Sequence, residues 1–279
     1  MRFFNLGRCL SLGALSACAI ALAEPAAGLG DQESLTYKVN WAILPGIGEI
    51  TINAHAANGG GGEPLLSVVT HTYTRGIARL ILPFEAKAES LFDPPTGRLI
   101  SLKESSAMRT KTDSHTVTFS YADETATYSD SAHPEDKRVL PMPAGLPTDL
   151  ITCLVQARTW GLRPGETHDA LVLFEDEFYL LTVHATGYEV VSTPLGVFTT
   201  VVLEPRMDKS PPIGMFKRGS KVKVWISEDP LHLPVQFKVD FKVGSGVATL
   251  VAHHPPVVAA RPASAALKRQ RLAAQKGPA

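Results

Sequence analysis

Hydrophobic and polar residues alternate with a period of two along much of the chain. The alternation is regular over 35–43 and 50–55, returns at 117–121, and is clearest at 235–243, where Val and Phe interleave with Gln, Lys and Asp. This period predicts β-strands with one buried face and one solvated face. Short runs rich in glycine and proline, such as 93–97, separate these segments. We therefore expect neighbouring strands to pair antiparallel, since parallel strands need longer crossovers.

One segment of the middle region has a helical pattern instead. Residues 149–160 predict a helix with Thr148 as its N-cap, Gly161 as its C-cap and an apolar stripe formed by Leu150, Ile151, Leu154 and Val155. A shorter helical turn is expected at 75–82, before Pro83. These elements predict a mainly β fold, in which a large, curved, half-barrel-like antiparallel sheet clasps one central helix. We expect residues 34–256 to form this single domain.

Both ends of the chain differ from the middle. Residues 1–23 combine Arg2 and Arg8 with an apolar stretch and an Ala-Leu-Ala cleavage site, which predicts a signal peptide and a periplasmic location. An alternative stays open, because Leu15-Ser16-Ala17-Cys18 resembles a lipobox. In that case Cys18 would carry lipid and the protein would associate with the outer membrane. We expect 24–33 to be a linker and 257–279 to be a disordered basic tail.

Composition and charge limit the kinds of molecule that this protein can bind. The chain has 279 residues, of which 44% are hydrophobic, so wholesale disorder is excluded. Residues 24–256 contain 20 basic and 27 acidic side chains, a net charge of −7, whereas the tail has five basic residues and no acidic one. An exported acidic body is a poor partner for nucleic acid. The basic tail would suit anionic lipid or an envelope polymer. Beyond residue 23, no apolar run is long enough for a membrane helix.

Motifs for catalysis, metals and cofactors are missing from the sequence. Gly244-Ser245-Gly246 lacks the spacing of a hydrolase elbow, and the adjacent His253 and His254 would point to opposite faces of a strand. The acidic run 175–177 predicts a charged hairpin turn rather than a calcium loop. Cys153 is expected to be a small buried side chain. We therefore predict no metal site, no cofactor and no catalytic set.

Carboxylates suited to glycan hydrolysis do occur among the expected strands, at Glu104, Asp113 and Glu189. Such chemistry requires two of them to lie a few ångströms apart, and the sequence brings no two of them together.

Trp225 is the strongest candidate for a ligand contact. It is out of phase with Val222, Val224 and Ile226 on its expected strand, so it must cover either protein or a ligand on the second face of the sheet. Lys223, on the same face, and Arg158, at the end of the expected helix, are the other candidates. Trp41, which is in phase with its neighbours, is expected to be a core residue.

These segments resemble the bacterial envelope proteins grouped as domain of unknown function 3108. The resemblance rests on four places in order along residues 34–252: Leu35 to Trp41 with Gly46 or Gly48 after it; Asp149-Leu150 with Ala157-Arg158; Thr193 to Phe198; and Trp225 to Asp229 with Pro234. The helix departs from the family pattern, because a serine is absent near its start and an aromatic residue near Ala157. The resemblance implies a secreted, mainly antiparallel β protein without an established enzyme activity.

From these observations we predict a non-enzymatic, exported cell-envelope protein that binds an apolar or polymeric envelope component. One alternative is a glycan-active hydrolase or lyase that uses Asp and Glu residues. The other is a structural envelope protein anchored through lipid on Cys18.

Overall fold

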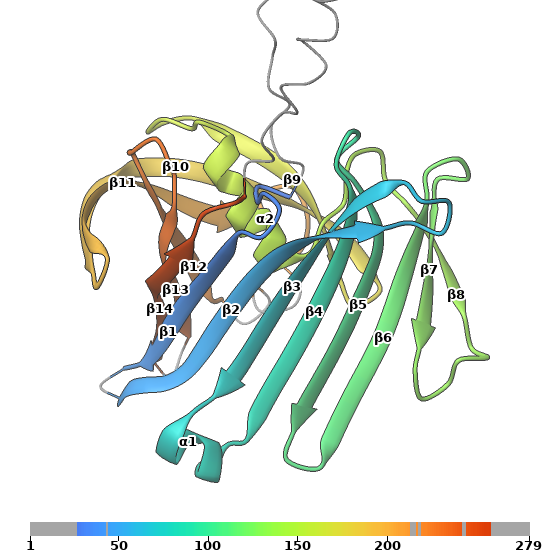
Figure 1. Ribbon diagram of the computed structural model, residues 1–279, viewed down its shortest axis with the longest axis horizontal. Helices are drawn as coiled ribbons and strands as arrows, with labels where there is room; N and C mark the ends of the chain where they lie inside the picture. The colour runs from blue at the N-terminus through green and yellow to red at the C-terminus, as the bar shows by residue number, and fades with distance from the viewer. Residues whose placement is uncertain (1–26, 43, 213–215, 217–218, 242–243, 258–279) are drawn as a thin grey trace, which may run out of the picture.

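The fold is one open antiparallel sheet. The computed structural model describes residues 27–42, 44–212, 216, 219–241 and 244–257. Fourteen strands hydrogen-bond in the order β8-β7-β6-β5-β4-β3-β2-β1-β14-β13-β12-β11-β10-β9 (Figure 1). Every neighbouring pair in this order is consecutive in the chain except β1 and β14. The sheet therefore consists of two meanders joined along one pair of strands.

The first meander has eight strands: β1 (Ser34–Trp41), β2 (Leu44–Asn58), β3 (Pro64–Thr74), β4 (Phe84–Asp93), β5 (Arg98–Met108), β6 (Lys111–Ser120), β7 (Thr125–Asp130) and β8 (Arg138–Pro141). The second has six: β9 (Thr167–Phe174), β10 (Glu177–Thr193), β11 (Gly196–Arg206), β12 (Lys221–Ser227), β13 (Pro234–Phe241) and β14 (Gly244–His254). Three short helical segments complete the described chain: α1 (Gly76–Ile81), α2 (Leu150–Gln156) and η1 (Ala157–Thr159).

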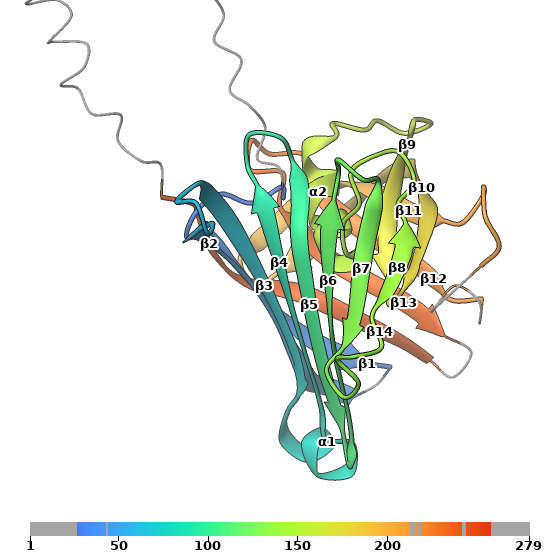
Figure 2. The same cartoon turned by 90° about the vertical axis from the view of Figure 1, so that its right-hand side faces the viewer.

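The two edge strands, β8 and β9, approach each other without pairing (Figure 2). Arg138 at the start of β8 forms an ion pair with Asp176 in the turn after β9. Thr148, which precedes α2, bridges to Val172 of β9 in parallel. Its amide donates to the carbonyl of Leu171 at 3.1 Å, and its carbonyl accepts from the amide of Leu173 at 2.9 Å. These contacts cover part of the β9 edge without closing the sheet.

Helix α2 contributes to both hydrophobic clusters of the protein. Val155 belongs to the cluster that includes the buried residues of β1 to β7, and Cys153, Leu154 and Ala157 belong to the cluster of β9 to β12. The N-cap is Asp149, whose Oδ1 accepts from the Thr152 amide at 2.9 Å. The prediction of Thr148 as the cap is thus wrong, because the backbone of Thr148 already pairs with β9.

The prediction of a mainly β protein built on one large antiparallel sheet is confirmed. The helix is shorter than predicted, since its α-helical part covers only Leu150–Gln156, and a clasped central helix stays a prediction. The helical turn expected at 75–82 is α1, and the acidic run forms the turn between β9 and β10. Cys153 is fully buried, as expected of a small core residue.

The N-terminal segment departs from the predicted linker. Ala27 and Leu29 are fully buried in the first cluster, and the carboxylate of Glu33 is almost fully buried. Apolar side chains and a paired charge fix this segment to the sheet. The predicted signal peptide, Cys18 and residues 258–279 of the predicted tail lie outside the described residues.

Candidate functional site

A polar groove lies on the face of the sheet that contacts α2. Register places five residues side by side across β3 to β7, at one level of this inner face: Thr70, Ala88, Glu104, His115 and Asp130. The next level adds Thr72, Ala86, Ser106 and Asp113. These two rows form the floor of what we call the concave groove, which has a volume of about 470 Å³. Ile151 of α2 and Phe174 and Glu175 at the end of β9 complete its walls.

Polar residues begin on this face where α2 stops covering it. One level above the groove, the same strands present Val68, Leu102 and Val117, all buried. At that level Ser90 donates from its hydroxyl to Asp149 Oδ2 at 2.7 Å and thereby fixes the start of α2 to β4. Burial raises the pKa of Asp149, hydrogen bonds from Thr152 and Ser90 oppose that rise, and the nearby charge of Glu104 adds to it. Glu104 in the groove therefore lies close enough to the start of α2 to influence the Asp149 carboxyl.

His115 and Glu104 form the centre of the groove floor. His115 Nε2 lies 3.0 Å from Glu104 Oε2, a distance that suits an ion pair when the imidazole is protonated. The alignment does not satisfy a hydrogen bond, so this buried nitrogen lacks an aligned partner among the residues that the structure describes. The distance and the missing alignment are compatible, because an ion pair requires only proximity. A hydroxyl or amine of a ligand would meet one carboxylate and one imidazole here.

Aromatic side chains border this polar centre. The ring of Tyr128 stacks on His115 with centroids 5.0 Å apart, and the guanidinium of Arg138 lies 4.3 Å from the centre of the same ring. Both contacts hold Tyr128 in place. Phe174 is 39% exposed at the opposite wall, so its ring offers an open apolar surface. Hydroxyls, carboxylates and one accessible aromatic ring are groups that recognise a hydroxyl-rich ligand.

Neither a metal centre nor a membrane-spanning helix is found among the residues that the structure describes. In the described residues, no group of three or more His, Cys, Asp and Glu side chains is placed to hold a metal ion. None of the helices in these ranges is long and apolar enough to cross a membrane.

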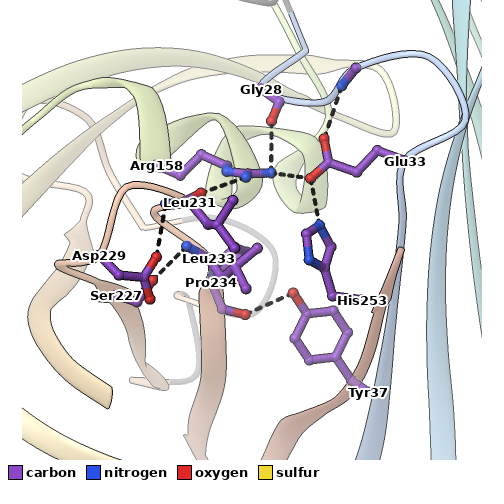
Figure 3. A network of polar contacts seen from close by, with 11 residues as sticks. Gly28, Glu33, Tyr37, Arg158, Ser227, Asp229, Leu231, Leu233, Pro234 and His253 are labelled. Carbon is purple, nitrogen blue, oxygen red and sulfur yellow. Dashed lines mark hydrogen bonds and ion pairs between the residues drawn. The ribbon is translucent and has the colours of Figure 1, made fainter. Parts of the chain in front are cut away.

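Arg158 lies in a buried ionic network at the far end of the helical segment (Figure 3). Its Nη1 donates to Glu33 Oε1 at 2.7 Å and to the carbonyl of Gly28 at 3.3 Å, while Nη2 donates to the carbonyl of Leu231 at 2.6 Å. His253 Nε2 lies 3.1 Å from the same oxygen of Glu33. The network ties together the N-terminal segment, the helix end, the β12–β13 turn and β14. A cavity of about 530 Å³ borders it.

The β12–β13 turn is itself held by hydrogen bonds that position the Leu231 carbonyl. Asp229 Oδ1 accepts from the Leu231 amide at 2.8 Å, and Ser227 Oγ accepts from the Leu233 amide at 2.7 Å. Tyr37 on β1 donates from its hydroxyl to the carbonyl of Pro234 at 2.8 Å. Arg158 therefore meets a preformed acceptor in the Leu231 carbonyl.

Trp225 contacts protein in this structure. Its side chain is 5% exposed, it belongs to the first hydrophobic cluster, and its indole N–H donates to Glu189 Oε2 at 2.8 Å. Lys223 on the same strand forms an ion pair with Glu204 at 3.0 Å. Trp41, expected in the core, is only half-buried and packs against Phe241. A ligand role for Trp225, Lys223 and Arg158 stays a prediction, and the structure does not gather the three in one site.

Two of the three carboxylates considered for glycan chemistry meet in the concave groove. Glu104 and Asp113 both line it, on adjacent strands and diagonal to each other, whereas Glu189 lies apart beside Trp225. Sequence reasoning missed His115, Tyr128 and Phe174. In 111–119, His115 is in phase with Val117 and Phe119. This pattern identifies the face of the strand on which His115 lies, but not the residues beside it on neighbouring strands.

The fold and the groove define a class of protein, an open single-sheet antiparallel β protein with a polar groove on its inner face. The chain belongs to the protein family of unknown function DUF3108, whose model matches residues 36–251. This match confirms the resemblance read from the sequence motifs. Among curated proteins, none matches the chain significantly.

Two solved structures show a distant likeness. A β-barrel-like protein of the domain of unknown function DUF1849 from Brucella abortus aligns with a TM-score of 0.49 and 9% identity, covering 81% of this chain and 98% of that chain. A protein of YmcC-like fold from Bacteroides fragilis, inferred to be exported, aligns with a TM-score of 0.30 and 10% identity, covering 81% and 97%.

Proposed function

We propose that this protein is an exported, non-enzymatic envelope protein whose concave groove binds a hydroxyl-rich polymer strand, such as a neutral or amino-bearing glycan. The observation that carries the proposal is the pair of polar rows across β3 to β7, bounded by the exposed ring of Phe174. Export is supported by the expected signal peptide.

The lining of the groove favours this ligand over an apolar one. Hydroxyls and carboxylates outnumber apolar side chains on the floor, so an apolar ligand would leave buried polar groups unpaired, at a cost. Four carboxylates line the groove, namely those of Glu104, Asp113, Asp130 and Glu175, against the single lysine Lys87. An acidic polymer would be repelled by this charge, whereas neutral hydroxyls and amines would find acceptors.

Binding is tested by calorimetry with three soluble probes: an amino-sugar oligomer (chitosan), its N-acetylated form, and an acidic uronate oligomer. We expect the first two to bind and the uronate not to bind. Glu104→Gln and Phe174→Ala should each weaken binding several-fold, because each removes a groove contact. Glu85→Gln is the matched control, since the same change falls on the opposite face of β4, where Glu85 pairs with His71 and Arg79. Equal affinities for all three probes, or equal losses in Glu85→Gln and Glu104→Gln, would contradict the proposal.

The meeting of Glu104 and Asp113 in one groove also favours a second candidate, a glycan hydrolase. It is tested on the same material by measuring the release of reducing ends from the bound probe. Cleavage that disappears in both Glu104→Gln and Asp113→Asn would establish the hydrolase and replace the binding role. Binding without cleavage supports the first proposal.

A further inference from the structure

The tip formed by α1 and the turn between β5 and β6 carries an unusual cluster of exposed apolar side chains. None of the residues of α1 is buried. Ile77, Leu80 and Ile81 are 76%, 85% and 68% exposed, and Leu82 and Met108 beside them are also exposed. A helix in a globular protein normally buries its apolar stripe, which provides most of its stability. Helix α1 lies at one end of the sheet (Figure 1), and its apolar side chains are exposed rather than packed on the protein.

The backbone of this tip is well bonded. Leu82 donates from its amide to the carbonyl of Ala78 at 2.8 Å, and the Thr74 hydroxyl donates to the carbonyl of Leu82 at 2.9 Å. Arg109 joins the β5–β6 turn to α1, with its amide 3.2 Å from the Pro83 carbonyl and its Nη2 3.3 Å from the Ile81 carbonyl. A segment that enters an apolar medium needs its backbone groups satisfied internally, and these bonds meet part of that need.

The charge of the tip is opposite to that of the body. Residues 75–84 and 107–112 contain Arg75, Arg79, Arg109 and Lys111 and no acidic residue, although residues 24–256 have a net charge of −7. Glu49 pairs with Arg75 and Glu85 pairs with Arg79 from the strands behind the tip. Among the described residues, no acidic group forms an ion pair with Arg109 or Lys111, so the tip keeps a net positive charge beside its apolar residues. Exposed apolar side chains flanked by Arg and Lys are the combination that binds the interface of an anionic bilayer.

We propose that the tip, defined as residues 75–84 and 107–112, docks this protein on the surface of a membrane that contains anionic lipid. The apolar side chains of α1 enter the boundary between headgroups and acyl chains, and the rim cations meet lipid phosphates. Leu44, exposed at the start of β2, lies toward the same end of the sheet, since Gly48 of β2 pairs with Thr74. This docking does not depend on the ligand of the groove.

The test is flotation with vesicles of phosphatidylethanolamine and phosphatidylglycerol, and with pure phosphatidylcholine vesicles. Protein processed by its own cell is used, so that all variants share the same terminal segments. We expect the triple variant Ile77→Ser, Leu80→Ser, Ile81→Ser to lose at least about tenfold in affinity for anionic vesicles. Lys111→Gln with Arg79→Gln should weaken the preference for phosphatidylglycerol, because two of the four tip cations are removed. The matched control is Val190→Ser with Val197→Ser, two exposed apolar residues on the β10–β11 hairpin, and it should bind as the parent does.

A second readout locates the tip directly. Leu80→Trp should show blue-shifted emission with anionic vesicles and quenching by lipids brominated on their acyl chains. Unchanged melting of the triple variant checks that it folds, which is expected because it alters only exposed side chains. The proposal is overturned if the parent ignores anionic vesicles, if the triple variant binds as tightly as the parent, or if the control loses as much. It is equally overturned if the tip only mediates self-association, seen as a dimer that the triple variant abolishes without any vesicle binding.

Discussion

Replacing Arg158 by alanine should destabilise the fold rather than only weaken a binding site. The change removes the guanidinium from the almost fully buried carboxylate of Glu33 and from the carbonyls of Gly28 and Leu231. Among the described residues, Glu33 would then keep the Gly30 amide and His253 as its partners. Breaking a buried ion pair by removing one partner costs about 3–5 kcal/mol, because the remaining charge stays in a poorly solvated site. For a domain of this size, each kcal/mol lowers the melting temperature by about 2–4 °C.

Urea unfolding at neutral pH, followed by tryptophan fluorescence, measures this loss as a lower midpoint with an unchanged slope. Lys223→Ala is the matched control, since its partner Glu204 lies in a more exposed pair that is worth about 1 kcal/mol or less. Adding Glu33→Gln to Arg158→Ala should restore part of the loss by removing the unpaired charge. A loss for Arg158→Ala no greater than that for Lys223→Ala, or no recovery in the double variant, would refute this account.

Three further predictions concern the helix and its surroundings. Asp149→Ala should cost about 2–4 kcal/mol, because it removes the cap and leaves Ser90 without its acceptor, whereas Asp149→Asn retains the cap. Burial raises the pKa of Asp149 in the folded state, so the free energy of unfolding of the wild type falls as pH rises from about 4 through that raised pKa. Thermal melts at pH 4 and pH 7 should therefore show that Asp149→Asn compares more favourably with the wild type at pH 7. Burial raises the pKa of Cys153 to about 12, so a thiol reagent at pH 8 should react only after unfolding, and rapid native labelling would contradict this. Gly28→Ala should destabilise far more than Gly161→Ala in thermal melts, because both have positive φ but only at Gly28 would a Cβ lie 2.8 Å from the Gln156 backbone.

The sequence predicts the strands best where one face is apolar and the other polar. Residues 235–241 and 35–41 show that alternation, and both form strands of the sheet. Alternation is much weaker over 103–113, because the groove makes the inner face polar there too, at Glu104, Ser106 and Asp113. Period-two patterning has no contrast to detect in such strands. Such strands can therefore be recognised only from their hydrogen-bonded register with neighbouring strands, which the structure supplies.

The groove itself depends on lateral alignment, which the sequence does not display. Glu104 and His115 become neighbours because the β5–β6 turn sets the register of that hairpin. Trp225 illustrates the opposite case. Its phase indicates correctly that it faces away from Val224, but only the structure supplies Glu189 and the first hydrophobic cluster as its surroundings.

The pairing of β1 with β14 brings the two ends of the described chain together. Strands at the two ends of the described chain pair along their whole length, and the Val257 amide donates to the Asp31 carbonyl at 2.9 Å. All other paired strands are chain neighbours. Joining these ends and opening the connection between β8 and α2 would turn the order of strands into one uninterrupted meander. In such a circular permutant, β14 and β1 would be neighbours in the chain and would pair as a local hairpin. The permutant should therefore fold faster than the protein with the natural strand order.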